Sequence, residues 1–82
     1  MYRVLIRYSF NGDDGTVTTD FWNSLAALGF LDAGTGLKRA ASLSPAQLQA
    51  FFQAAASRAH GAVTGKGSAV GVDHFIIVVE SI

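Results

Sequence analysis

The stretch that decides the fold is YRVLIRYSF, residues 2–10. Large apolar side chains occupy its even positions, and arginine occupies two of its odd positions, Arg3 and Arg7. Successive side chains of a strand point to opposite faces, so this period of two predicts a β-strand with one apolar face. That face would consist of Tyr2, Val4, Ile6, Tyr8 and Phe10. We expect helices to cover it and the arginine-bearing face to stay open to solvent or to a polar partner.

The first helix is predicted downstream of the turn residues 11–15. It begins near Thr18 or Thr19, since either side chain can act as its N-cap. It ends before Gly29, a residue suited to the left-handed position that follows a helix. Its apolar stripe at helical spacing consists of Phe21, Leu25 and Leu28, with Trp22 and Ala26 beside it.

The second helix has a sharper start at residues 44–47, Ser-Pro-Ala-Gln. Ser44 is the expected N-cap, Pro45 the first helical residue and Gln47 the third, which together form a capping box. Its predicted apolar stripe consists of Leu48, Phe51, Phe52, Ala55 and Ala59. We expect Gly61 to end it.

The remaining segments complete one domain over residues 1–82. Segments 30–32 and 37–42 flank turn residues and predict a short irregular hairpin. Residues 61–71 are predicted to form a loop, and residues 72–82 a last strand whose apolar run 75–79 suits at least partial cover on both faces. The order strand, helix, hairpin, helix, strand predicts an α+β ferredoxin-like sandwich, with two helices on one face of a small antiparallel sheet.

Composition excludes several classes of protein. Of the 82 residues, 50% are hydrophobic and 15% charged, and six Lys+Arg balance six Asp+Glu. Disordered chains have low hydrophobicity and high net charge, and binding driven chiefly by phosphate neutralisation needs a basic surplus. Cysteine is absent, which excludes disulfides and thiolate sites. No apolar run reaches the roughly 18 residues of a membrane span. We expect a cytoplasmic protein with no membrane association.

The small size favours association with a second copy. A domain of about 60 residues buries only about 60% of its unfolded surface, and this chain is little larger. Because the chain has no disulfide and no predicted metal site, association with a second copy is the expected additional source of stability. We expect a homodimer, with the open sheet face as the surface that the second copy covers.

Candidate catalytic and metal-binding residues are few. His60 lies at the predicted end of the second helix, where an imidazolium would interact favourably with the helix dipole. His74 follows Asp73, but neighbours on a strand point to opposite faces, so we expect no contact between them. Asp13 and Asp14 have the oxygen ligands of a hard cation, yet two acids in a turn are also ordinary turn formers. We therefore predict no catalytic residue, no metal and no cofactor.

Basic residues are distributed unevenly along the chain. Residues 37–70 contain four and no acid, whereas four aspartates precede them. A local basic patch can contact phosphate at zero net charge, although charge scatter on a solvated surface gives the same pattern. If the partner is nucleic acid, the predicted contact residues are Arg3, Arg7, Lys38, Arg39 and Lys66.

Three segments together resemble a known family. Residues 2–11 form an apolar opening strand, residues 28–30 read Leu-Gly-Phe at a helix end, and residues 43–48 read Leu-Ser-Pro-Ala-Gln-Leu at a helix start. In this layout the chain resembles the small CRISPR-associated endoribonuclease-like proteins, whose dimers take part in spacer acquisition. The resemblance extends over most of the chain to Arg58 and implies a ferredoxin-like fold and a dimer.

The chain departs from that family at one position. The family's metal-binding aspartate, at the end of the first strand, aligns with Ser9 here. A serine hydroxyl does not supply the anionic oxygen that a Mg²⁺ site requires. The resemblance therefore implies a family-like scaffold without the nuclease.

The sequence thus predicts a non-catalytic, dimeric ferredoxin-like protein that acts by binding a protein or a nucleic acid. One alternative is a divalent-metal-dependent endoribonuclease in which Asp13 or Asp14 replaces the lost aspartate. Another is a small-ligand sensor with its site at a dimer interface.

Overall fold

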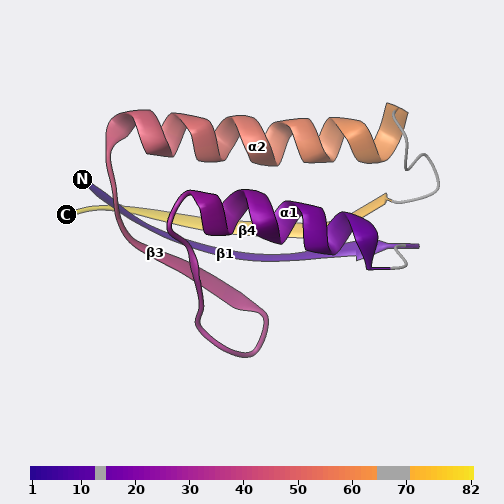
Figure 1. The fold of residues 1–82 in the computed structure, drawn as a ribbon, viewed down its shortest axis with the longest axis horizontal. Helices are drawn as coiled ribbons and strands as arrows, with labels where there is room; N and C mark the ends of the chain where they lie inside the picture. Colours follow the sequence, from indigo (N-terminus) through magenta and orange to yellow (C-terminus); the bar gives the residue numbers. More distant parts are fainter. Residues whose placement is uncertain (13–14, 65–70) are drawn as a thin grey trace.

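The fold is an α+β sandwich of the ferredoxin-like type, with two helices on one face of a four-stranded antiparallel sheet (Figure 1). The computed structural model describes residues 1–12, 15–64 and 71–82, with side chains at 1–12, 15–58 and 72–82. The strands are arranged in the order β2-β3-β1-β4. The elements are β1 (Tyr2–Asn11), α1 (Thr16–Ala27), β2 (Leu31–Asp32), β3 (Leu37–Leu43), α2 (Pro45–Thr64) and β4 (Gly71–Ser81).

The central strand β1 has the orientation that its alternation predicts. Val4 and Ile6 are completely buried beneath the helices, whereas Arg3 and Arg7 are exposed on the other face. Pairing with β3 on one side and β4 on the other places β1 in the middle of the sheet. Both helices therefore pack against the face that carries the apolar side chains.

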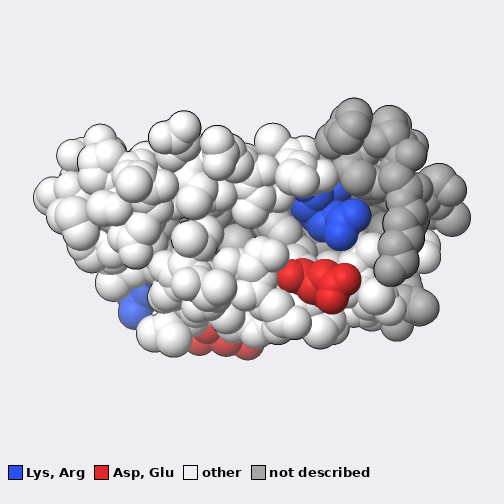
Figure 2. Space-filling view, turned by 45° about the horizontal axis from the view of Figure 1, so that its top comes forward, with Lys and Arg blue, Asp and Glu red and all other residues white. Residues whose placement is uncertain are grey.

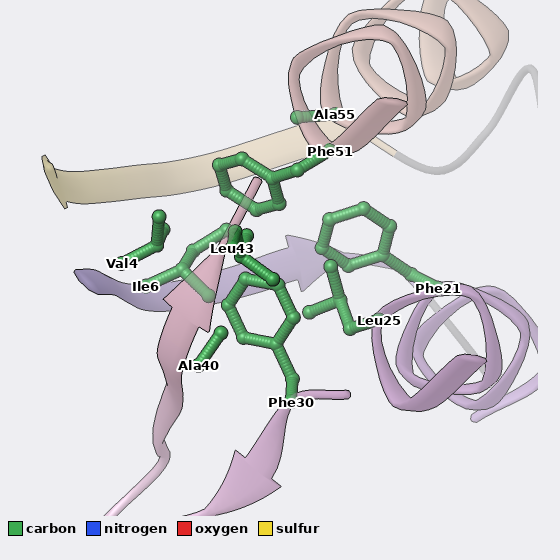
Figure 3. Close-up of a cluster of buried hydrophobic side chains, with 9 residues drawn as sticks. All are labelled: Val4, Ile6, Phe21, Leu25, Phe30, Ala40, Leu43, Phe51 and Ala55. Carbon is green, nitrogen blue, oxygen red and sulfur yellow. The ribbon is translucent and has the colours of Figure 1, made fainter. Parts of the chain in front are cut away.

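The core lies between that face and the two helices (Figure 3). The rings of Phe30 and Phe51 stack with centroids 5.1 Å apart. A second aromatic group lies against the core, where Phe21 stacks on Phe75 at 5.5 Å and meets the edge of Tyr8 at 4.8 Å. The buried core residues are Val4, Ile6, Phe21, Leu25, Phe30, Ala40, Leu43, Phe51 and Ala55.

Helix α1 begins earlier than predicted. Its first residue is Thr16, and the N-cap is Gly15 in a left-handed conformation with φ of 103°. The prediction of Thr18 or Thr19 as N-cap was wrong because the glycine turns the chain directly into the helix, and no side-chain cap is used. At the other end Gly29, with φ of 97°, follows the helix as expected.

Helix α2 begins as predicted and ends later. The Ser44 N–H donates to Gln47 Oε1 at 2.8 Å, and the Gln47 N–H donates to Ser44 Oγ at 3.2 Å, so the capping box is present. Gly61 does not end the helix, which continues to Thr64. A glycine ends a helix only where the chain turns into a left-handed conformation, and here helical bonding continues through it. The prediction that Phe52 belongs to the buried stripe was also wrong, since its side chain is 44% exposed.

The predicted hairpin and last strand are both present. The Gly34 N–H donates to Asp32 Oδ1 at 2.9 Å and closes the turn between β2 and β3. Strand β4 pairs with β1 and is the outermost strand on its side of the sheet. Among the residues described, no helix has the length and apolarity needed to cross a membrane.

Candidate binding surface on the open sheet face

We call the face of the sheet opposite the helices the open face. Its apolar side chains form a continuous patch, which we call the apolar floor. The strand register shows which side chains are neighbours on this face. Leu5 lies between Val78 of β4 and Arg39 of β3. One step along β1, Arg7 lies between Ile76 and Leu37. The apolar residues of the open face are Leu5, Leu31, Leu37, Ile76 and Val78.

These apolar side chains are accessible. Leu31 is 70% exposed, Ile76 58% and Val78 46%. Leu5, Leu37, Ile76 and Val78, together with Arg7, line a shallow hollow of about 270 Å³. Contiguous apolar surface of this kind on a small domain marks an interaction site more often than a scattered exposed leucine does.

The charges on the open face are mostly positive. Arg3 lies 3.8 Å from Glu80 across the β1–β4 pair, in a loose and exposed ion pair. Arg7 and Arg39 form no ion pair with any described residue. The face therefore offers two guanidinium groups with free donors beside an apolar floor, and guanidinium groups bind planar carboxylates and phosphates in a bidentate manner.

Lys38 does not belong to this surface. Its Nζ lies 3.3 Å from Asp32 Oδ2 and 4.7 Å from the centroid of the Trp22 ring, on the helix-bearing side. The Gly34 N–H and then the Lys38 ammonium lower the pKa of Asp32. Of the five predicted contact residues, the structure brings Arg3, Arg7 and Arg39 together; Lys38 faces away, and Lys66 lies outside the described residues, as do Asp13 and Asp14.

Asp73 and His74 are in contact, contrary to the expectation for neighbours on a strand. Asp73 Oδ2 lies 3.3 Å from His74 Nδ1. The register with β1 shifts here, since Ser9 pairs with His74 and Phe10 pairs with Val72. Asp73 is therefore the extra residue of a β-bulge, and a bulge breaks the strict alternation of side chains.

The bulge brings Ser9, His74 and Asp73 next to one another in the sheet, but the serine hydroxyl does not contact the histidine. Ser9 is directly opposite His74 in the sheet. Nevertheless, His74 Nε2 is enclosed and has no hydrogen-bond partner among the described residues. A general base must reach the proton that it removes, and this nitrogen reaches no described hydroxyl. In the same residues, no group of three or more His, Asp or Glu side chains is placed to hold a metal ion. The His60 side chain lies outside the description.

A second hollow lies between the two helices, on the opposite side of the molecule. It measures about 290 Å³ and is bordered by Asp20 and Ser24 of α1 and by Ala54, Ser57 and Arg58 of α2. Figure 2 shows adjacent basic and acidic surface on this helix-bearing side. Arg58 Nε is enclosed without a partner in the described structure. Phe21 of α1 also lines this hollow, so its walls combine polar and apolar side chains.

No family model, curated protein or solved structure matches this chain. The site is therefore defined by its own geometry. The basic part of the open face was predicted from β1, whereas its apolar part on β2 and β3 was not. The alternation of Leu37 with Arg39 is the sequence signal that could have located it, once β3 is paired with β1.

Proposed function

We propose that this chain is a non-catalytic binding protein whose open face receives an acidic, apolar segment of another protein. The observation that carries the proposal is the combination of an accessible apolar floor with two arginines that lack an acidic partner within the described residues. Aliphatic side chains of the segment would pack on Leu5, Ile76 and Val78. Its carboxylates would pair with Arg7 and Arg39.

The chemistry of the floor favours a protein over a nucleic acid. Sheets that bind single-stranded RNA stack its bases on aromatic rings. The described side chains of the open face include no ring other than the His74 imidazole, and the aromatic residues of β1 and β4 face the helices. Aliphatic side chains bury apolar surface but give bases no stacking platform. Nucleic acid is therefore the competing outcome that the test must exclude.

We include the CRISPR-associated endoribonuclease-like scaffold in this proposal, with the nuclease absent. Ser9 stands where the family's metal-binding aspartate would be. In the structure Ser9 is opposite His74, and the described residues include no group of three or more His, Asp or Glu side chains placed to hold a metal ion. A scaffold that keeps the layout and lacks the acid supports a role in binding.

The experiment is residue-resolved titration by NMR, for which an 8.6 kDa chain is well suited. The probes are a soluble peptide of alternating glutamate and leucine, the same peptide with lysine for glutamate, and a single-stranded RNA oligonucleotide. We expect the acidic peptide alone to shift amide signals of Leu5, Arg7, Leu37 and Ile76. Shifts produced only by RNA, or confined to the helix-bearing side, would overturn the proposal.

Variants separate the arginines from general electrostatics. Arg7→Gln/Arg39→Gln should weaken binding of the acidic peptide more than about tenfold, because each charge-assisted hydrogen bond contributes about 1.5–3 kcal/mol. The matched control is Lys38→Gln/Arg58→Gln, which removes the same charge from the helix-bearing side. Equal loss in both double variants would show that only net charge matters.

A further inference from the structure

Strand β4 ends the sheet with an unprotected edge. It is eleven residues long, and within residues 1–12, 15–64 and 71–82 its neighbour in the sheet lies only on the β1 side. Alternate residues of such an edge direct their N–H and C=O groups outward, where they are free to pair with another strand. Soluble proteins usually protect such edges with lysine, proline or a bulge. The bulge of β4 lies near its beginning at Asp73, and the run 75–79, Phe-Ile-Ile-Val-Val, has none of these devices.

Exposed apolar side chains gather along this edge. Val79 is 38% exposed although it lies on the helix-bearing side, opposite the buried Val4. Ile76 and Val78 are exposed on the open face, and the terminal residues Met1 and Ile82 add further apolar surface where the two chain ends meet (Figure 1). The other edge strand, β2, has only two residues, and its Asp32 is paired with Lys38.

The edge is complementary to itself in one register. Residues on the same face pair when a twofold axis perpendicular to the sheet passes midway between the two β4 strands, level with one residue of β4 and its copy. An axis at Ile77 pairs the whole apolar run with itself, so that Ile76 is opposite Val78 of the second copy. The same register brings His74 opposite Glu80 of the second copy, an imidazole opposite a carboxylate.

Neighbouring registers are poorer. Moving the axis to Ile76 would set the exposed Val79 opposite Asp73 of the second copy. Moving it to Val78 would set Glu80 opposite Ile76. In each case a charged side chain faces an apolar one across the interface and loses hydration without gaining a partner.

We propose that two copies of this chain pair antiparallel through β4, about a twofold axis at Ile77, and form a continuous eight-stranded sheet. The open face is a poorer surface for a second copy, because face-to-face packing would bring Arg3, Arg7 and Arg39 of both copies together with only Glu80 from each to offset them. Edge pairing leaves the arginines of both copies free. The inference therefore goes beyond the proposed function and does not depend on it.

Solution mass tests the interface. Light scattering after gel filtration should give twice the 8.6 kDa chain mass at high protein concentration. In Ile76→Lys/Val78→Lys each new lysine faces another across the axis, so dissociation should become at least tenfold easier. The matched control Leu31→Lys/Leu37→Lys places the same charges on the same face but on β2 and β3, which β1 separates from β4, and it should remain dimeric.

The solution masses of the wild type and the two double variants together support or overturn the proposed interface. A monomeric wild-type chain, or dimers that survive the β4 variant, would overturn it. Dissociation of both double variants, each still folded by circular dichroism, would place the second copy on the open face. A monomeric wild-type chain could still bind the acidic peptide, so failure of this proposal is distinguishable from failure of the proposed function.

Cross-linking tests the register without relying on a destabilised variant. The chain has no cysteine, so single cysteines report cleanly. A mixture of Ile76→Cys and Val78→Cys should form mainly the mixed disulfide, because these positions oppose each other when the axis lies at Ile77 and directly opposed Cα atoms lie within disulfide range. Preferential self-linking of Ile76→Cys would place the axis at Ile76 and contradict the proposed register.

Discussion

Phe51 and Phe52 are adjacent residues of the same type with opposite environments. Phe51 is completely buried and stacks on Phe30, whereas Phe52 is 44% exposed. Both belong to the predicted apolar stripe of α2, so residue type alone does not show which of them is buried. The difference arises because adjacent residues of a helix point about 100° apart, and only one of them can face the sheet.

Truncating each ring should therefore have very different effects. We expect Phe51→Ala to lower the free energy of unfolding by about 3–5 kcal/mol, through lost burial and the cavity that remains. Phe52→Ala, the matched control, should cost less than about 1 kcal/mol. Urea unfolding followed by circular dichroism measures both. Similar losses in the two variants would show that Phe52 is buried in the folded state in solution.

Asp32 gives the fold a contribution that depends on pH. The Gly34 N–H and the Lys38 ammonium lower the pKa of its carboxyl, and its negative charge in turn adds to burial in raising the pKa of the Tyr8 phenol. A folded-state pKa below the unfolded value means that the carboxylate stabilises the fold above the unfolded pKa of about 3.9. That stabilisation is lost as pH falls through the lowered folded-state pKa.

The variant Asp32→Asn keeps an acceptor for the Gly34 N–H and removes only the charge. Its urea midpoint should fall below that of the wild type at about pH 7, and the difference should shrink as pH falls through the lowered folded-state pKa of Asp32. Asp20→Asn is the control, because the Asp20 carboxylate makes no ion pair with a described residue. A difference that is constant with pH would contradict the assigned charge interaction.

At the scale of elements, the capping box that starts α2 was predictable from local chemistry, whereas the bulge of β4, which depends on strand pairing, was not. Ser44 and Gln47 lie within one helical turn and satisfy each other, so their sequence spacing was sufficient. The bulge at Asp73 depends on how β4 pairs with Ser9 and Phe10, more than 60 residues earlier in the chain. That pairing is long-range, and the local alternation therefore predicted the wrong relation between Asp73 and His74.

The start of α2 should depend on its capping box. Replacing Ser44 by alanine leaves the Gln47 N–H without its acceptor and should lower the free energy of unfolding by about 1 kcal/mol. Ser57→Ala makes the same chemical change on the exposed middle of α2 and should be neutral or slightly stabilising. Thermal unfolding of the two variants separates the cap from helix propensity. Equal effects would show that the cap does not contribute.

The same contrast holds for the candidate site. The arginines of β1 were assigned to the open face because the strand alternates strictly, and Arg3 and Arg7 lie there. Lys38 was grouped with Arg39 by proximity in sequence, yet a strand sends neighbours to opposite faces, and Lys38 instead meets Asp32 and Trp22. The apolar floor required knowledge of which strands pair, because its members come from all four.

At the scale of the whole molecule, the open face and the β4 edge have different chemistry. The face combines apolar surface with the guanidinium groups of Arg7 and Arg39, which have no acidic partner in the described part of the chain, and this favours an acidic partner protein. The edge combines backbone groups that pair with no other described strand with an apolar run between His74 and Glu80, which favours a second copy. The two surfaces meet at Ile76 and Val78, so a peptide lying across the face of a dimer would span the twofold axis.

Thermal stability provides a test of association that needs no partner. If the folded wild-type chain is dimeric over the measured concentrations, its unfolding temperature must rise with protein concentration, because association favours the folded state by mass action. A tenfold increase should raise the midpoint by roughly 3–5 °C for a chain of this size, since half of about 1.4 kcal/mol is gained per chain. The β4 variant Ile76→Lys/Val78→Lys should lose this dependence, whereas Leu31→Lys/Leu37→Lys should keep it. A wild-type midpoint that does not move with concentration would mean that the edge of β4 remains unpaired in solution.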